Sequence, residues 1–88
     1  MVDARTVEFR PDARRQLERK SAFVAQRILT KIKWLADNYD LVRHEPLSAE
    51  LKGLFKLRVG DYRVIYSSKR LVITIHLIGH RREIYERK

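Results

Sequence analysis

Apolar residues in the first half of the chain recur at the spacing of an α-helix. Between residues 24 and 39 they follow one another at intervals of four, four, three and four residues, which predicts a single buried stripe. The stripe consists of Val24, Ile28, Ile32, Leu35 and Tyr39. Ser21 is a suitable N-cap, so we predict a helix from Ser21 to about Asn38 whose apolar side forms the core.

Shorter elements precede this helix. Val7 and Phe9 alternate with polar residues and predict a strand over Arg5 to Phe9. Pro11 suits the first turn of a helix, which we place from Pro11 to about Lys20. This helix is mostly charged, with Ala13 and Leu17 as its apolar contact, so we expect it to lie over the surface of the domain.

The segment Leu54 to Tyr66, LFKLRVGDYRVIY, has the pattern of a β-hairpin that turns at Gly60-Asp61. That turn places Val59 opposite Tyr62, Arg58 opposite Arg63 and Leu57 opposite Val64. Lys56 then lies opposite Ile65, and Phe55 lies opposite Tyr66. Because side chains alternate between faces, one face is apolar. The other face carries three cations, which are Lys56, Arg58 and Arg63.

A third strand follows over Leu71 to Ile78, after a polar turn that we place at Ser68-Lys69. This register puts Tyr66 opposite Leu71 and leaves Val72, Thr74, His76 and Ile78 on the outer face, with His76 near the cations. Gly79 is expected to end the strand. The sequence therefore predicts one α+β domain over residues 1–88, of order βααβββ, with a small antiparallel sheet packed against two N-terminal helices.

The charge of the chain points to an anionic partner. Twenty Lys and Arg face eleven Asp and Glu, a net charge of +9. Residues 50–88 hold ten basic and four acidic residues, or +6, so the excess lies with the hairpin. Arg58 directly opposite Arg63 is unfavourable in a purely structural hairpin, and two interpretations remain open: a solvated face or a polyanion site.

Other classes of site find less support. The absence of cysteine excludes disulfides and thiolate zinc sites, and no apolar run is long enough to span a bilayer, so we expect a cytosolic protein without a cofactor. His44 and Glu45 lie in a predicted connecting loop, Asp40 to Ala49; with no second ligand cluster nearby, His44 is interpreted as a loop histidine and not as part of a metal or acid/base site. Trp34 lies beside the apolar stripe, where partial burial is the commoner role and base stacking the alternative.

The C-terminal run GHRREIYERK combines His80, Arg81 and Arg82 with the aromatic Tyr85. A basic tail is usually a solvated end. Arginines that hold phosphate and a ring that stacks on a base are, however, the composition of a single-stranded RNA site.

The run LKGLFKLRVGDYRVIY, followed by a strand and by IGHRREIY, resembles the RelE-type toxins of the RelE/ParE superfamily from toxin-antitoxin systems. The resemblance covers the whole chain in length and element order, and its specific part is Leu51 to Tyr85. It implies a metal-independent endoribonuclease that cleaves mRNA in the ribosomal A site. A ribose 2′-hydroxyl then attacks the adjacent phosphate, which requires a base, positive charge on the phosphorane and stabilisation of the leaving 5′-oxygen.

The resemblance also implies roles for individual residues. Lys56 is the candidate general base, Arg63 stabilises the phosphate, and Arg81 acts at the leaving group with a share for His80. Tyr85 stacks on a substrate base. Arg58 stands where a family lysine can lie, and since arginine stays protonated it clamps phosphate and does not act as a base. RNA contacts are expected from Arg58, Arg82 and Lys52, and Lys52 is equally well explained as a surface lysine.

A cognate antitoxin is the partner that the resemblance implies, and the net charge of +9 suggests that it is acidic. Operator DNA would be bound only through the antitoxin complex. One rival is a ParE-type inhibitor of DNA gyrase, which has the same fold and acts by binding without cutting RNA. A second rival is a nucleic-acid-binding domain with no activity.

Overall fold

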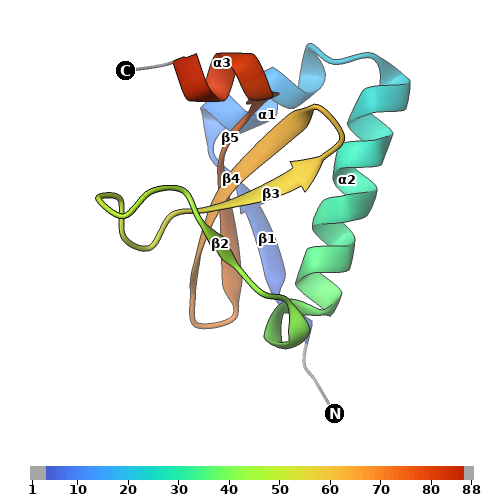
Figure 1. Cartoon of the computed structure of the whole chain (residues 1–88). Coiled ribbons are helices and arrows are strands. Elements are labelled where there is room, and N and C mark those ends of the chain that lie inside the picture. Colours follow the sequence, from blue (N-terminus) through green and yellow to red (C-terminus); the bar gives the residue numbers. More distant parts are fainter. Residues whose placement is uncertain (1–3, 87–88) are drawn as a thin grey trace.

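The computed structural model describes residues 4–86, with side chains as far as Ile84. A five-stranded sheet forms the centre of the fold (Figure 1). Its elements in chain order are β1 (Thr6–Phe9), α1 (Pro11–Glu18), α2 (Ala22–Asp37), a 3-10 turn (Tyr39–Leu41), β2 (Glu45–Pro46), β3 (Phe55–Val59), β4 (Tyr62–Lys69), β5 (Val72–His80) and α3 (Arg81–Glu86). The predicted α+β class is confirmed.

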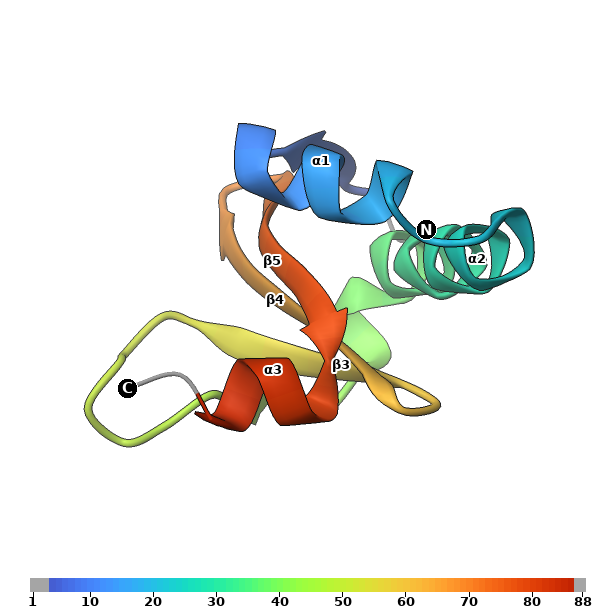
Figure 2. The same ribbon diagram turned by 90° about the horizontal axis from the view of Figure 1, so that it is seen from above.

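The strands are arranged in the order β1-β5-β4-β3-β2. The meander from β2 to β5 is antiparallel, whereas β1 lies at the sheet edge parallel to β5. Residues of α1 and α2 pack on one face of the sheet, and Figure 2 shows α3 on the side opposite to α1. Within residues 4–86, the sheet therefore has one face covered by α1 and α2 and a second face on which α3 lies.

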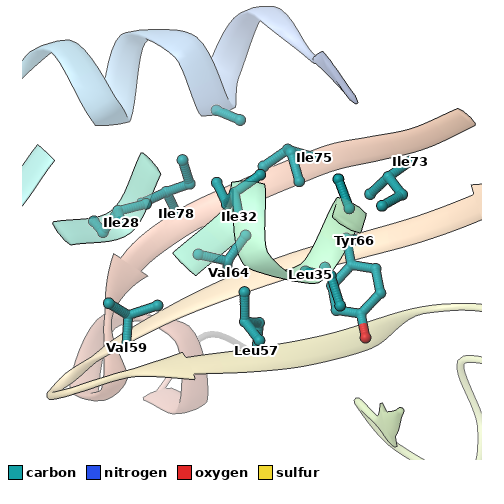
Figure 3. Close-up of a cluster of buried hydrophobic side chains, with 12 residues drawn as sticks. Ile28, Ile32, Leu35, Leu57, Val59, Val64, Tyr66, Ile73, Ile75 and Ile78 are labelled. Atoms are coloured by element: carbon teal, nitrogen blue, oxygen red, sulfur yellow. The ribbon is translucent and has the colours of Figure 1, made fainter. Parts of the chain in front are cut away.

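The long helix α2 forms as its apolar stripe predicts. Ser21 caps it, with Oγ accepting a hydrogen bond from the backbone N–H of Val24 at 3.2 Å. Ile28, Ile32 and Leu35 are almost fully buried against residues of β3, β4 and β5 (Figure 3). Fully burying side chains of this size stabilises a fold by about 1.5–3 kcal/mol each.

The first hairpin has the predicted register at all five positions, from Val59 opposite Tyr62 to Phe55 opposite Tyr66. Gly60 adopts a φ of 60°, a left-handed conformation that glycine reaches without strain. The turn chemistry therefore fixed the pairing of β3 with β4.

The second hairpin differs from the prediction by its turn. Lys69 pairs with Val72, so Arg70 and Leu71 form the turn instead of Ser68 and Lys69. Arg70 has a φ of 59°, a left-handed conformation that residues other than glycine seldom adopt, so the local sequence does not indicate a turn at this position. Tyr66 consequently lies opposite Ile75 and not Leu71.

A β-bulge in β5 also changes which residues face the core. Ile75 pairs with Tyr66 while Leu77 pairs with Ile65, so His76 is the extra residue. Beyond the bulge the faces exchange, and Ile78 lies opposite Val64 in the core instead of on the outer face. The prediction assumed that successive side chains of the strand alternate strictly between the two faces of the sheet, which leaves no place for an extra residue.

Three elements were not predicted with these bounds. Within the expected loop 40–49 the chain makes a 3-10 turn and the two-residue strand β2. Gly79 does not end the third strand but lies inside β5 opposite Arg63, and the expected tail is the helix α3. An added Cβ at Gly79 would be 3.4 Å from side-chain atoms of both Glu83 and Ile84, so glycine permits the close approach of α3.

Candidate functional site

Two rows of side chains cross the outer face of the sheet. Strand pairing aligns Glu45, Lys56, Ile65 and Leu77 in one row, and Arg58, Arg63 and Gly79 in the next. Neighbouring strands lie about 4.8 Å apart, so these residues form one continuous surface. The face that carries the predicted cations therefore also carries a carboxylate from β2.

Glu45 lies between two of the cations. Its Oε2 is 3.0 Å from Nη2 of Arg58 and 3.4 Å from Nζ of Lys56. The hydrogen bond from Arg58, together with the positive charge of Lys56, lowers the pKa of Glu45 below its ordinary value of 4.5 although partial desolvation opposes the shift. The carboxylate is therefore deprotonated at neutral pH.

The unfavourable pairing of Arg58 with Arg63 is relieved because the two side chains take different partners. Arg58 reaches across to Glu45, while Nη1 of Arg63 donates to the carbonyl oxygens of Gly60 and Tyr62, both at 2.9 Å. Arg63 is only 8% exposed. Arg63 is thus buried and hydrogen-bonded within the β3–β4 turn, whereas the sequence placed it on an outer face that was either solvated or a polyanion site.

The start of α3 is tied to the same turn. The backbone N–H of Arg81 donates to the carbonyl oxygen of Asp61 at 2.7 Å, and the Arg81 Nε lies 3.9 Å from the Asp61 carboxylate. Arg63 and Arg81, which are 18 residues apart in the sequence, are therefore both hydrogen-bonded to the β3–β4 turn.

His80 occupies the N-cap position of α3. Its Nδ1 accepts a hydrogen bond from the backbone N–H of Arg82 at 3.2 Å, and the backbone N–H of His80 donates to Oε1 of Glu83 at 2.9 Å. Its ring meets the ring of Tyr62 edge-on, with 5.6 Å between the centroids. Since Tyr62 is on the helix-covered face, His80 does not join the row of Arg58 and Arg63.

The remaining predicted residues surround these clusters. Lys52 is exposed in the loop between β2 and β3, which extends away from the sheet in Figure 1, and Arg82 is exposed on α3. The backbone of Tyr85 belongs to α3, but its side chain lies outside the described residues.

Both other histidines make structural contacts. The Nδ1 of His44 is 2.6 Å from the hydroxyl of Tyr66, and its Nε2 is 2.9 Å from the carbonyl oxygen of Tyr39. His76 was expected near the cations, but its Nε2 is 2.8 Å from Oγ of Ser67. Burial, and secondarily the charge of Arg10, lowers the pKa of His76.

Glu45 is the member of the site that the sequence reasoning missed. It stands in a stretch without periodicity, beside Pro46, and a strand of two residues has no pattern to detect. Glu50 lies nearer than Glu45 to the strand of cations in the sequence, so the sequence carries no local signal that singles out Glu45.

Trp34 lies beside the stripe and is exposed, at 42%, with Nζ of Lys31 4.0 Å from the centre of its ring. In residues 4–86 no cluster of three or more histidine and acidic side chains is arranged to hold a metal ion. Over the same residues, every helix falls short of the length and apolar character that a membrane crossing requires.

Comparisons with known proteins agree on one superfamily. The family model described as "ParE toxin of type II toxin-antitoxin system, parDE" matches residues 7–85. No curated protein matched the chain.

Solved structures of toxins and toxin-antitoxin complexes share the fold. A chain of the RelBE2 complex from Mycobacterium tuberculosis is 27% identical, with 89% of this chain and 99% of that chain covered and a TM-score of 0.74. The isolated RelE toxin of E. coli is 16% identical, with coverage of 94% and 93% and a TM-score of 0.75. A chain of the chromosomal ParDE system of P. aeruginosa is 16% identical, with coverage of 88% and 96% and a TM-score of 0.71.

At these identities the RelE and ParDE structures establish the fold alone. The family model, in contrast, spans nearly the whole chain and includes the hairpin, β5 and most of α3. The chain therefore belongs to the ParE toxin family of type II toxin-antitoxin systems, within the RelE/ParE superfamily.

Proposed function

We propose that this toxin is an endoribonuclease of the RelE type, a single toxin domain that cleaves mRNA in the ribosomal A site. The observation that carries the proposal is the juxtaposition of a deprotonated carboxylate, Glu45, with Lys56 and Arg58. The Arg63 and Arg81 pair adjoins it at the hairpin turn. Attack of a 2′-hydroxyl on phosphate needs a proton acceptor next to concentrated positive charge, and this face offers both.

Glu45 is a better candidate than Lys56 for the general base. A lysine ammonium has three N–H donors and no lone pair to accept a proton, whereas the Glu45 carboxylate, 3.4 Å from Nζ of Lys56, is an acceptor. In the proposed reaction Glu45 takes the proton of the ribose 2′-hydroxyl, and the 2′-oxygen bonds to phosphorus. Lys56 then acts as a cation on the phosphorane.

The arginines supply the remaining positive charge around the reacting phosphate. Arg58 clamps the phosphate from the exposed side, and Arg63 contributes positive charge from beneath the turn. Arg81 is 54% exposed at the start of α3 and stabilises the leaving 5′-oxygen, which takes its proton from solvent. The bond between phosphorus and the 5′-oxygen breaks, giving a 2′,3′-cyclic phosphate and a 5′-hydroxyl end.

His80 is proposed as a positioning residue for Arg81. Its cap on Arg82 fixes the first turn of α3 and thereby the direction of the Arg81 side chain. His80→Ala is expected to reduce cleavage, and His80→Asn, which keeps a capping acceptor, to restore most of it. Equal loss in both variants would show that the imidazole itself is required.

The outer members of the site are proposed to bind RNA around the reacting phosphate. Tyr85 stacks on a substrate base, and Lys52 and Arg82 contact the RNA backbone. If stacking is the role of Tyr85, Tyr85→Phe retains more cleavage than Tyr85→Ala, as measured by the rate on one defined mRNA. Equal loss would point to the hydroxyl instead.

A cognate antitoxin is the proposed protein partner. The support is that similar structures are toxin-antitoxin complexes, among them RelBE2 and ParDE. The net charge of +9 favours an acidic antitoxin that masks the cationic face, and operator DNA would be bound through that complex. Because its proposed substrate is mRNA on ribosomes, the toxin would act in the cytoplasm.

The decisive experiment is primer extension on a defined mRNA paused on ribosomes, with the wild type and with Glu45→Gln. Wild type is expected to cut at the A-site codon, and Glu45→Gln to cut far more slowly. Asp37→Asn is the matched control, since Asp37 is also an exposed carboxylate paired with a lysine, at 3.0 Å on α2. Intact mRNA with the wild type would refute the nuclease.

A ParE-type gyrase inhibitor is the second candidate, and the description of the matching family model favours it. The same preparation is therefore tested for inhibition of DNA supercoiling by gyrase. Blocked supercoiling with intact mRNA would establish this candidate and reduce the clusters to a docking surface. Cleavage without an effect on supercoiling would exclude it.

A further inference from the structure

The last part of β5 has an edge without a neighbouring strand. Within residues 4–86, β1 pairs with residues 72–75 of β5 and with no later ones. Its last bond to β5 runs from the backbone N–H of Arg10 to the carbonyl oxygen of Ile75, at 2.9 Å, and Pro11 then begins α1. In Figure 2 this part of β5 leads from α1 to α3. A strand edge of this kind presents backbone N–H groups that lack a strand partner.

Two side-chain oxygens accept these N–H groups. The N–H of Ile78 donates to Oε1 of Gln16 at 2.7 Å, and the N–H of His80 donates to Oε1 of Glu83 at 2.9 Å. Ile78 and His80 are two residues apart, so both N–H groups point to the same edge of β5. Gln16 belongs to α1 and Glu83 to α3, and we call the two residues the edge acceptors. They take the place of the missing strand.

The bond to Gln16 protects a buried part of the backbone. Ile78 is 1% exposed, and its bond to Gln16 joins residues that are 62 positions apart in the sequence. Gln16 and Glu83 line the same hollow, which has a volume of about 400 Å³. A buried N–H needs an acceptor, and solvent in this hollow would reach the amide of Ile78 if the Gln16 oxygen were removed.

The edge acceptors hold the junction between β5 and α3. Gly79 lies opposite Arg63, and His80 directly precedes Arg81. From the other side, the backbone N–H of Arg81 donates to the carbonyl oxygen of Asp61 at 2.7 Å. The junction is thus fixed by the hairpin turn at Arg81 and by the edge acceptors just before it. A shift of the backbone at residues 78–80 would therefore displace Arg81.

We propose that Gln16 is a positioning residue for the proposed RNA cleavage. Together with Glu83 it fixes the end of β5, and this keeps Arg81 at the leaving 5′-oxygen. The catalytic consequence rests on the proposed function, whereas the hydrogen bonding of the strand edge does not. Gln16 acts through the backbone and has no assigned contact with RNA, so its loss slows the reaction of bound RNA without weakening RNA binding.

The test compares two replacements of Gln16 that keep the length of the side chain. Gln16→Glu retains an oxygen that can accept the N–H of Ile78, whereas Gln16→Met offers only a weakly accepting sulfur. Gln26→Met is the matched control, because it makes the same replacement on α2, where Nε2 of Gln26 donates to Oγ1 of Thr30 at 3.3 Å. Thermal melts confirm that each variant is folded at the temperature of the assays.

Amide hydrogen exchange followed by NMR tests the edge acceptors without any reference to RNA. Gln16→Met is expected to speed exchange of the Ile78 amide at least about fivefold, and the other two variants to change it less than about twofold. Unchanged exchange in Gln16→Met would refute the proposal. Equal acceleration in Gln16→Met and Gln26→Met would refute it too, because the effect would not come from the bond to β5.

The ribosome cleavage assay tests the action through Arg81. Gln16→Met is expected to lower kcat about tenfold at unchanged KM, and Gln16→Glu to stay within about threefold of the wild type. When Gln16→Met is added to Arg81→Ala, the remaining rate is expected to fall less than about twofold, because the arginine that Gln16 positions is already absent. A full tenfold loss in that background, or equal losses in the Met and Glu variants, would overturn the positioning role.

Failure here and failure of the proposed nuclease are distinguishable. Cleavage at the wild-type rate by Gln16→Met would refute the positioning role and leave the nuclease intact. A wild type that leaves mRNA intact, with faster Ile78 exchange in Gln16→Met, would refute the nuclease and support the edge acceptors as the groups that hold the end of β5.

Discussion

Replacing Tyr66 by phenylalanine removes one hydroxyl from the core and tests how the segment before β2 is held. The Tyr66 ring is 1% exposed and packs near Phe55 and Tyr39, with ring centroids 5.7 and 6.4 Å away. Its hydroxyl is 2.6 Å from Nδ1 of His44. Because His44 precedes Glu45, this bond holds the candidate base next to Lys56.

The expected loss of stability follows from the lost hydrogen bond and from Nδ1 of His44, which would be left without the Tyr66 hydroxyl as its partner. The ring remains, so the apolar burial is nearly unchanged. A neutral hydrogen bond contributes about 1 kcal/mol net, and a buried group left without its partner adds about 1–3 kcal/mol. We expect a loss of about 2 kcal/mol, which in a domain of this size lowers Tm by roughly 8–16 °C.

Alkaline pH gives a second signature of the same hydroxyl. Burial, and secondarily the nearby Tyr39, raises the pKa of Tyr66 above its ordinary value of 10.0. The unfolded chain then loses this proton at a pH where the folded protein keeps it, so stability is complete below pH 10 and falls as pH rises above it. Tyr66→Phe is expected to remove this part of the alkaline decline.

Urea denaturation followed by circular dichroism measures both effects, and the ribosome cleavage assay measures the consequence for Glu45. Tyr62→Phe is the control, because Tyr62 is a less buried tyrosine whose ring contacts His80 edge-on. A Tyr66→Phe protein within about 0.5 kcal/mol of the wild type would refute the reasoning. So would an alkaline decline equal to that of the wild type.

Four further outcomes are expected. Glu45→Gln slows RNA cleavage about 10²–10⁴-fold while the circular dichroism spectrum stays that of the wild type; a rate within twofold would remove Glu45 as the base. Cleavage by the wild type falls as pH drops through the lowered pKa of Glu45, below 4.5, because the carboxylate must be unprotonated; a pH–rate profile that is flat there would contradict this role. Arg63→Ala lowers the free energy of unfolding by about 1–3 kcal/mol and abolishes cleavage, because the hydrogen bonds from the guanidinium to the turn are lost. Arg81→Ala reduces cleavage at nearly unchanged stability. Equal destabilisation by the two variants would show that Arg63 does not stabilise the turn. Gly60→Ala and Gly53→Ala each place a non-glycine residue at a positive φ, but only at Gly60 would the new methyl approach the Arg27 side chain, at 3.3 Å. Thermal melts are therefore expected to show the larger loss of stability for Gly60→Ala. Equal losses would mean that the Arg27 side chain moves away without cost.

The parts of the fold that the sequence predicted are those with a strong local signal. The stripe from Val24 to Tyr39 has helical spacing and a capping serine, and Gly60-Asp61 is a turn that determines a register. The second turn was misplaced because Arg70 adopts a left-handed φ although it is not glycine. The bulge at His76 interrupts the alternation of β5. Neither feature has a sequence pattern of its own.

The candidate site was predictable as a collection of charges but not as an arrangement. The run FKLR and the turn indicated Lys56, Arg58 and Arg63 on one hairpin. The contacts that define their roles arise between distant segments, as Glu45 reaches β3 from a two-residue strand and Arg81 meets the turn through α3. Burial of Arg63 likewise depends on the carbonyl oxygens that a turn happens to direct inward.

The parallel pairing of β1 with β5 determines when the sheet can form during synthesis of the chain. Residues 6–9 pair with residues 72–75, so β1 can join the sheet only after residues 72–75 have been synthesised. A chain that ends before residue 72 lacks β5, the strand that joins β1 to β4. If the proposed cleavage acts on the toxin's own transcript ahead of the codons for β5, the shortened products are therefore unable to assemble the sheet, and the toxin would limit its own supply.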